Sequence, residues 1–326
     1  MKKLLAILLS LAFVFSACAG DPEQPAPGTK TYRFFVPDGA PALAVANFTA
    51  PSAQLTDFSL HVVNANSIAA HASTDADLAI MPVNAASKLF GNGEKMKMVA
   101  VVTHGNLFIV GNGEASALTD LYGKTLGVIQ RGNVPDLTLK AIFEEKGIEY
   151  VESQTAVEGK VAIQYYDVAT NMLPALKQGV LDFGVLPEPA ATNSALPVRF
   201  SLQELYGEND YPQAVLMIKT TALDDWSARY VEDILEALAE SIAWVNEDVE
   251  GRPAAAVAKL APYLEEGLQS SLDGSKLTHT SIANCNLSVQ TTGDGAEDAV
   301  QGYLARIKAI EPSAVGDVSD AFFYAL

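Results

Sequence analysis

Asp38, Arg131 and Glu188 each lie in a turn that follows a short apolar run of the chain. A carboxylate accepts hydrogen bonds from amines and from the N–H groups of heteroaromatic rings, whereas a guanidinium binds carboxylate, sulfonate or phosphate oxygens. The two acids therefore favour a small neutral or amine-bearing ligand. Arg131 is the only permanent cation in these turns and leaves a simple anion as the alternative.

The two acids differ in what else they could do. Asp38 precedes a predicted helix and could cap its first turn instead of binding a ligand. Glu188 lies between Pro187 and Pro189, where capping is less natural. We therefore expect Glu188 to contact the ligand and leave both roles open for Asp38.

The sequence contains no arrangement typical of an enzyme or a metal site. None of the four histidines stands in a motif with a serine or cysteine, and the Gly-x-Ser-x-Gly elbow is absent. No His-x-x-x-His pair, Cys-x-x-Cys pair or calcium loop occurs. The segment 111–113 lacks the spacing of a dinucleotide loop and predicts a turn. We expect no catalysis, no metal and no cofactor.

Two stretches of the chain, residues 77–86 and 182–191, share one pattern: Asp, a short apolar run, Pro, two variable residues and a pair of alanines. The pattern predicts a buried strand, a turn and a helix start. A second pair of turns, at 39–43 and 132–137, also follows predicted strands. Such junctions recur in many α/β proteins, but two pairs in the same order indicate two similar lobes.

Ligands of open α/β sheets bind beyond the carboxyl ends of the strands, so loops from both lobes should line one crevice. Helix amino ends there expose unpaired N–H groups suited to anionic oxygens. Aromatic candidates for stacking are Phe48, Phe108, Tyr165, Tyr166 and Tyr211. The candidate ligand-binding residues are Asp38, Gly39, Ala40, Asn84, His104, Asn106, Gln130, Arg131, Gly132, Asn133 and Glu188.

From Tyr32 onward, short β-rich runs alternate with Ala- and Leu-rich helical runs, which predicts an α/β fold with mostly parallel sheets covered on both faces. The expected strands are 32–36, 59–63, 78–81, 98–102, 107–110, 125–129, 161–166, 183–186 and 214–218. The expected helices are 41–47, 135–146, 171–178, 224–246, 253–265 and 297–309.

The chain should change lobe at two strand crossings, near residues 104–110 and 211–217. Residues 31–104 together with 213–326 then form the first lobe, and residues 107–210 form the second. Two crossings make a hinge, and closure of hinged lobes around a ligand is a common protein motion.

The amino-terminal segment has the features of a lipoprotein signal. Lys2 and Lys3 precede an apolar run, Leu4 to Phe15, that is too short to span a bilayer comfortably, and Ser16-Ala17-Cys18 follows. We expect cleavage after residue 17 and lipidation of Cys18, with an uncleaved anchor or a plain secreted form as alternatives. Residues 18–30 are rich in proline and predict a tether.

The formal net charge of −18 argues against binding to nucleic acid and against a second, electrostatic attachment to anionic lipid. The lipid anchor should be the only contact with the membrane, and we expect a monomer. Cys285 has no partner if Cys18 carries lipid, so it is expected as a buried small residue, with a reactive thiol as the alternative.

Several segments together resemble the solute-binding lipoproteins of ABC importers, in the branch that includes alkanesulfonate, nitrate and thiamine-pyrimidine binders. They are the signal with Cys18, 37–41 (PDGAP), 121–128 (LYGKTLGV), 173–176 (LPAL) ahead of 179–183 (GVLDF), 188–190 (EPA), 241–246 (SIAWVN) and 253–256 (PAAA). The resemblance implies a two-lobed periplasmic-binding-protein fold, type II-like, with two strand crossings as hinge. It also implies that the acid of Glu188-Pro189 lies near the ligand.

The expected function is that of a lipid-anchored, non-enzymatic solute receptor at the cell surface or in the periplasm. It would capture a small, amine-bearing or heteroaromatic solute and deliver it to an ABC permease. Two alternatives stay open: a small-molecule lyase of the same fold, and a sensory or adhesive surface lipoprotein with no transported solute.

Overall fold

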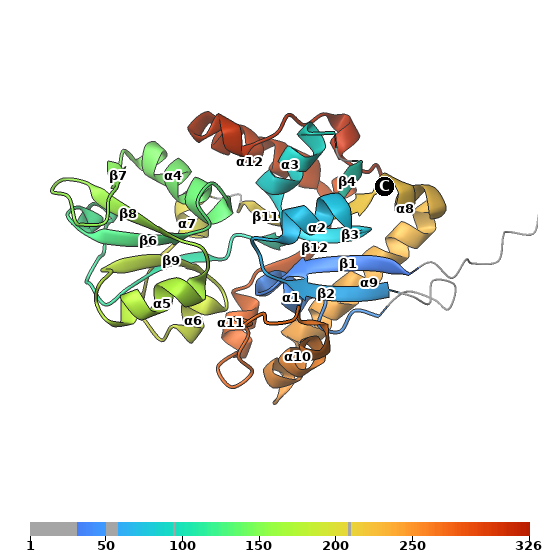
Figure 1. Cartoon of the computed structure of the whole chain (residues 1–326), viewed down its shortest axis with the longest axis horizontal. Helices are drawn as coiled ribbons and strands as arrows, with labels where there is room; N and C mark the ends of the chain where they lie inside the picture. The colour runs from blue at the N-terminus through green and yellow to red at the C-terminus, as the bar shows by residue number, and fades with distance from the viewer. Residues whose placement is uncertain (1–30, 50–57, 94, 208–209) are drawn as a thin grey trace, which may run out of the picture.

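Two six-stranded sheets, each covered by helices on both faces, organise the chain. The computed structural model describes residues 31–49, 58–93, 95–207 and 210–326, and Figure 1 shows the sheets side by side. The predicted signal and tether, including Cys18, lie outside the described residues. We call the part built on each sheet the first and the second lobe.

The sheet of the first lobe is mixed. Its strand β1 pairs in parallel with β2 and β3, so that Phe34 lies opposite Leu60 on one side and Leu78 on the other. Strand β11 runs antiparallel to β3 and β4, and β12 is antiparallel to β4. The strands in spatial order are β12 (Leu287–Thr291), β4 (Met96–His104), β11 (Pro212–Lys219), β3 (Leu78–Pro82), β1 (Tyr32–Pro37) and β2 (Phe58–Val63).

The second sheet repeats this plan. Strand β6 is parallel to β8 and β9, and β5 is antiparallel to β9 and β10. The expectation of mostly parallel sheets therefore fails at the crossings, because the chain leaves the first lobe through β4 and returns through its neighbour β11 in the opposite direction. The strands in spatial order are β10 (Val198–Ser201), β5 (Leu107–Val110), β9 (Phe183–Pro187), β6 (Thr125–Ile129), β8 (Val161–Tyr166) and β7 (Tyr150–Glu152).

Helices cover both faces of each sheet, and none among the described residues is long and apolar enough to cross a membrane. In the first lobe they are α1 (Ala40–Ala44), α2 (Ile68–Thr74), α3 (Val83–Gly91), α8 (Thr220–Asp225), α9 (Ala228–Asn246), α10 (Arg252–Leu260), α11 (His279–Ala283) and α12 (Ala296–Ile310). In the second they are α4 (Val134–Lys146), α5 (Ala169–Lys177), α6 (Ala190–Asn193) and α7 (Leu202–Tyr206). Short 3-10 turns are η1 (Leu118–Leu121), η2 (Ala261–Tyr263), η3 (Thr292–Asp294), η4 (Pro312–Ala314) and η5 (Asp320–Phe322).

Strand residues supply two apolar layers in turn, because successive side chains of a strand point to opposite faces. Phe35 and Ala79 pack in the layer under α2, α3 and α12, whereas Phe34 and Leu78 pack in the layer beside α1, α9 and α10. Figure 1 shows these two groups of helices on opposite sides of the first sheet. A single strand therefore contributes side chains to both apolar layers.

The helix predicted over 224–246 is two helices. α8 ends at Asp225 and α9 begins at Ala228, because the Ser227 side chain accepts a hydrogen bond from the Tyr230 N–H and caps the new helix. The apolar stripe expected along this segment is confirmed within α9. Its members are buried: Tyr230, Ile234, Leu235, Leu238, Ile242 and Val245.

The two crossings between the lobes are hydrogen-bonded to each other. Gly105, between β4 and β5, donates its N–H to Asp210 Oδ1 at 3.1 Å. Asn286, the residue before β12, donates to the Gly105 carbonyl at 3.3 Å and to Asp210. The outgoing chain, the returning chain and the segment before β12 therefore meet at one point.

A second contact joins the lobes through helices α12 and α4. Thr138 of α4 and Tyr303 of α12 share a buried hydrogen bond of 2.7 Å between their hydroxyl groups. Arg306 of α12 forms an ion pair with Glu145 of α4. The apolar side chains around them belong to one continuous core that includes strands of both sheets.

Gly105 should tolerate no side chain. A methyl group there would overlap Asp210 Oδ1 and lie 2.6 Å from Tyr211 Cε1, inside the crossing. We expect Gly105→Ala to lower the free energy of unfolding by about 1–3 kcal/mol, the usual cost of overpacking. Urea denaturation measures this change.

Gly302→Ala is the matched control, because a methyl group at this position of α12 would meet no atom within 4 Å. It should raise the free energy of unfolding by about 0.5–1 kcal/mol, since alanine favours a helix over glycine. Equal stability of the two alanine variants would contradict the close packing of the crossings.

Candidate ligand-binding site

A cavity of about 400 Å³ lies between the lobes. The turns after β1, β2 and β3 and the loop 267–271 line it from the first lobe, and the turns after β6, β8 and β9 line it from the second. Residues at the two crossings complete the lining. The cavity thus lies beyond the carboxyl ends of the parallel strands, where open α/β sheets bind ligands.

Six of the eleven candidate residues line this cavity: Asp38, Gly39, Ala40, Asn106, Gln130 and Glu188. Asn84, His104, Arg131, Gly132 and Asn133 are not among its lining residues. The five aromatic candidates also lie elsewhere. Phe48 packs against Phe34 and Phe58, for example, and Tyr211 stacks on Tyr303.

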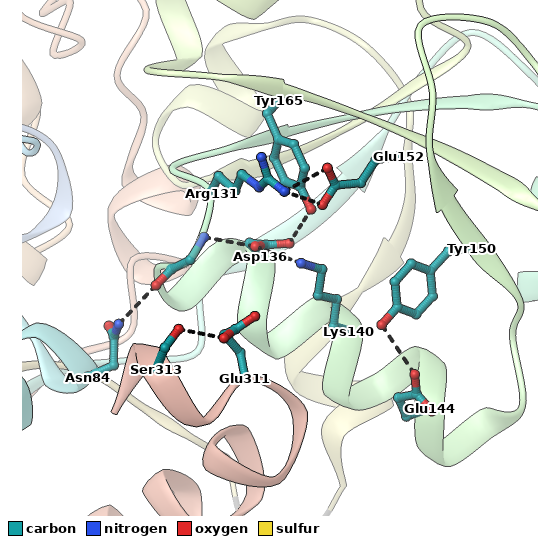
Figure 2. A network of polar contacts seen from close by, with 11 residues as sticks. Asn84, Arg131, Asp136, Lys140, Glu144, Tyr150, Glu152, Tyr165, Glu311 and Ser313 are labelled. Carbon is teal, nitrogen blue, oxygen red and sulfur yellow. Dashed lines mark hydrogen bonds and ion pairs between the residues drawn. The ribbon is translucent and has the colours of Figure 1, made fainter. Parts of the chain in front are cut away.

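Arg131 is directed away from the cavity, towards Glu152. Its Nη2 atom donates to both carboxylate oxygens of Glu152 at 2.7 Å, and its guanidinium lies 5.1 Å from the centre of the Tyr165 ring. Figure 2 shows this pair above Asp136, which accepts hydrogen bonds from Tyr165, from Lys140 and from the Gly132 N–H. Burial raises the pKa of Tyr165, and the nearby carboxylate of Asp136 adds to this rise.

Asn84 and Asn133 have structural positions in the same region. The buried Asn84 side chain donates to the Gly132 carbonyl at 3.2 Å and to the Ala314 carbonyl at 3.3 Å, so it joins α3 to the second lobe (Figure 2). Asn133 is the N-cap residue of α4, and its N–H donates to the Gln130 carbonyl.

Asp38 does not cap the helix that follows it. The N-cap residue of α1 is Gly39, and the Asp38 carboxylate accepts hydrogen bonds of 2.6 Å from the Ser270 hydroxyl and from the Ser271 N–H. These two residues lie in the loop that closes the cavity on the first-lobe side. Asp38 therefore anchors that loop at the cavity wall.

Glu188, by contrast, does cap a helix, although its two flanking prolines argue against it in sequence. Its carboxylate accepts hydrogen bonds from the Thr192 N–H at 3.1 Å and from the Thr192 hydroxyl at 2.7 Å, in the first turn of α6. Asn284 of the first lobe also donates to it at 3.5 Å. Glu188 is 2% exposed and lines the cavity, so its carboxyl group is buried and hydrogen-bonded there.

Five helices begin at the cavity: α1, α3, α4, α5 and α6. None of them is capped by the side chain of its N-cap residue, although Glu188 caps α6 from the preceding position. Elsewhere Ser201, Ser227 and Thr278 cap helices as N-cap residues. The amino ends carry partial positive charge. They offset the two carboxylates, which are the only charged side chains in the lining.

Asn106 and Gln213 form the base of the cavity at the crossings. The Gln213 side chain donates to Asn106 Oδ1 at 2.9 Å, and the Asn106 side chain donates to the Cys285 carbonyl at 3.2 Å. Cys285 itself is fully buried, as expected, and burial raises the pKa of its thiol. Among the described residues no group of three or more His, Cys, Asp or Glu side chains could hold a metal ion.

The model of the NMT1/THI5 like family matches residues 61–251, more than half of the chain. The chain belongs to this family. Its matched part contains both crossings and the whole second lobe, and so all the cavity turns except the one after β1 and the loop 267–271. No curated protein sequence matches the chain.

Solved structures share the two-lobed fold at low identity. An ABC transporter protein from Parabacteroides distasonis has a TM-score of 0.69 and 19% identity over 90% of this chain and 99% of its own. The zinc-bound ligand-binding component of an ABC-type import system from Staphylococcus aureus has a TM-score of 0.63 and 14% identity, over 90% of this chain and 96% of its own. The periplasmic aliphatic sulphonate binding protein SsuA from Escherichia coli has a TM-score of 0.62 and 13% identity, over 90% of this chain and 92% of its own. The predicted periplasmic-binding-protein fold is confirmed.

Sequence reasoning missed several residues that line the cavity in the folded protein. Asn64 follows β2, and Thr170 and Asn171 begin α5 after β8, but neither junction has the proline that marks the others. A search for every strand-to-helix junction would have found them. The loop 267–271 gave no signal, because only the tertiary fold brings it to Asp38.

His104, at the end of β4, should make stability depend on pH. Burial lowers its pKa below the ordinary 6.5, and the nearby Asp210 only partly opposes this. Below pH 6.5 the unfolded chain therefore binds the proton more readily than the folded protein. The stability that neutral His104 contributes is present above this pH and is lost as the pH falls through it.

We expect His104→Gln to reduce the loss of unfolding free energy between pH 7 and pH 5, measured by urea denaturation at each pH. His61, whose pKa is also lowered by burial, should respond in the same direction to the same substitution. Parallel pH profiles for the wild-type protein and both variants would contradict this assignment.

Proposed function

We propose that this protein is an extracytoplasmic receptor that captures a small organic solute between its lobes and delivers it to an ABC importer. The cavity between the lobes, built on the crossings themselves, carries the proposal. Family membership and the two-lobed fold support it. So do the names of similar structures, which describe an ABC transporter protein, a ligand-binding component of an import system and a sulphonate-binding protein.

A binding role fits the chemistry of the lining better than catalysis. No histidine or cysteine side chain lines the cavity, so its serine and threonine hydroxyls have no neighbouring imidazole base there. The two acids are held by hydrogen bonds from Ser270, Ser271 and Thr192. These fixed polar groups can orient a solute without reacting with it.

The proposed cycle uses the crossings as a hinge. A solute between the lobes would touch turns of both and favour the closed arrangement, because only that arrangement offers all contacts at once. Since Asn106 and Gln213 both line the cavity and join the crossings, they connect solute binding to lobe position. The closed protein would then dock on a permease and release the solute as transport separates the lobes.

A fluorescence thermal-shift screen of small metabolites tests this function. A true solute at a hundredfold excess over its dissociation constant should stabilise the protein by about 2.7 kcal/mol. The same solute should reduce the radius of gyration measured by solution X-ray scattering. Conversion of the solute into product would instead favour the lyase alternative, and a screen without any binder would favour the sensory or adhesive one.

We also propose that Cys18 carries lipid and holds the protein at the outer face of a membrane, with the proline-rich segment as tether. Cys18→Ser should move the protein from the membrane fraction to the soluble exported fraction and leave solute affinity unchanged. Immunoblotting of cell fractions measures the shift. Retention of the variant in the membrane fraction would mean that the apolar segment from Leu4 to Phe15 stays in place as an anchor.

A further inference from the structure

Gln130 has an unusual backbone for its residue type. Its φ of 54° lies in the left-handed region, which among the described residues other than glycine only Ala195 and Asn286 share. The turn fixes this conformation, because the Gln130 N–H donates to the Tyr166 carbonyl and its own carbonyl accepts from the Asn133 N–H, both at 2.9 Å. Glycine or asparagine would suit this backbone better. Glutamine is therefore not explained by the turn itself.

The side chain of Gln130 offers such an explanation. Gln130 lines the cavity, and its side-chain amide makes no hydrogen bond to any other described residue. The neighbouring amides at the crossings, by contrast, bond to each other. A glutamine amide provides two N–H donors and one carbonyl acceptor. Strained residues at binding sites commonly have a role in the site, and Gln130 is a strained residue in the cavity lining.

The charge of the lining restricts what this amide can meet. Asp38 and Glu188 are the only charged side chains in it, and no lysine, arginine, histidine or aromatic ring contributes. A carboxylate can accept about four hydrogen bonds, and the Asp38 carboxylate accepts two from the protein. Capacity for a ligand amine therefore remains. The amino ends of the longer helices α3, α4 and α5 carry partial positive charge and offset these negative charges.

We propose that Gln130 is a specificity-determining residue of the cavity and that the solute is a small aliphatic compound carrying an amine and a hydrogen-bond acceptor. The inference rests on the proposed receptor function and narrows its solute class. The amine pairs with the carboxylates, and the acceptor pairs with the Gln130 amide. A simple anion lacks a cationic partner in this lining, and a heteroaromatic ring lacks an aromatic side chain to stack on.

Four probes compared by thermal shift test the solute class: β-alanine and γ-aminobutyrate, which carry both groups, ethanesulfonate, an anion, and 4-aminopyrimidine, an aromatic amine. The two amino acids should raise the melting temperature, and the other two should not. Stabilisation by ethanesulfonate or 4-aminopyrimidine instead would overturn the solute class. Failure of all four probes would overturn it too. The receptor function falls separately, only if the wide metabolite screen also finds no binder.

Three variants, titrated calorimetrically with γ-aminobutyrate, test the residue. Gln130→Gly fits the backbone and removes the amide, so affinity should fall about threefold to tenfold, as for one hydrogen bond. Ala195→Gly is the matched backbone control, because Ala195 has a φ of 58° and does not line the cavity. Arg131→Gln is the charge control, since its guanidinium binds Glu152.

Both controls should bind γ-aminobutyrate like the wild-type protein, and neither glycine variant should have a lower melting temperature than the wild-type protein without solute, because glycine fits the left-handed backbone. Wild-type affinity in Gln130→Gly would overturn the role of Gln130. A loss of affinity in Arg131→Gln that exceeds the loss in Gln130→Gly would show that the solute's acceptor group pairs with the guanidinium, which also overturns the proposal.

Discussion

The hydrogen-bonded amide pair of Asn106 and Gln213 is the constraint on which the rest of the site depends. Asn106 is fully buried; its side chain bonds to Gln213 and donates to the Cys285 carbonyl, and its backbone carbonyl accepts a hydrogen bond from the Glu188 N–H. A buried amide without partners would cost about 1–3 kcal/mol. The pair therefore fixes both crossings, the end of α11 and the end of β9 relative to one another, and the cavity forms above it.

The contacts between the lobes differ in kind on the two sides of this junction. On the cavity side they are few and polar, such as the hydrogen bond from Asn284 to Glu188. On the side of α12 and α4 they include a continuous apolar core and the hydroxyl pair of Thr138 and Tyr303. Opening the polar side costs little because water replaces its hydrogen bonds, whereas opening the apolar side would expose core. Rotation of the lobes should therefore keep α12 against α4.

The sequence predicted those features that depend on local pattern, and it failed where partners are distant in the chain. Alternating apolar runs and the two repeated junctions predicted nine of the twelve strands in the described residues and the position of the cavity, because each junction is encoded within ten residues. They missed β7, β10 and β12. Glu188 lines the cavity but also caps α6, and Asp38 does not take the capping role that was left open for it. Asp38 bonds to Ser270 and Ser271, which only the tertiary fold brings near, and Glu188 caps α6 from a position that propensity disfavours. The pairing of Arg131 with Glu152 could not be predicted either, because the two residues lie 21 positions apart in the chain.

The apolar core shared by the lobes also bears on how the protein loses its structure. Cooperativity extends as far as a core is continuous, and here one cluster contains residues of the first sheet, the second sheet, α4 and α12. Neither lobe can melt alone without exposing apolar surface of the other. Two lobes joined by a hinge would ordinarily give two calorimetric transitions. Here they should melt as one unit, with a heat capacity change that belongs to the whole chain.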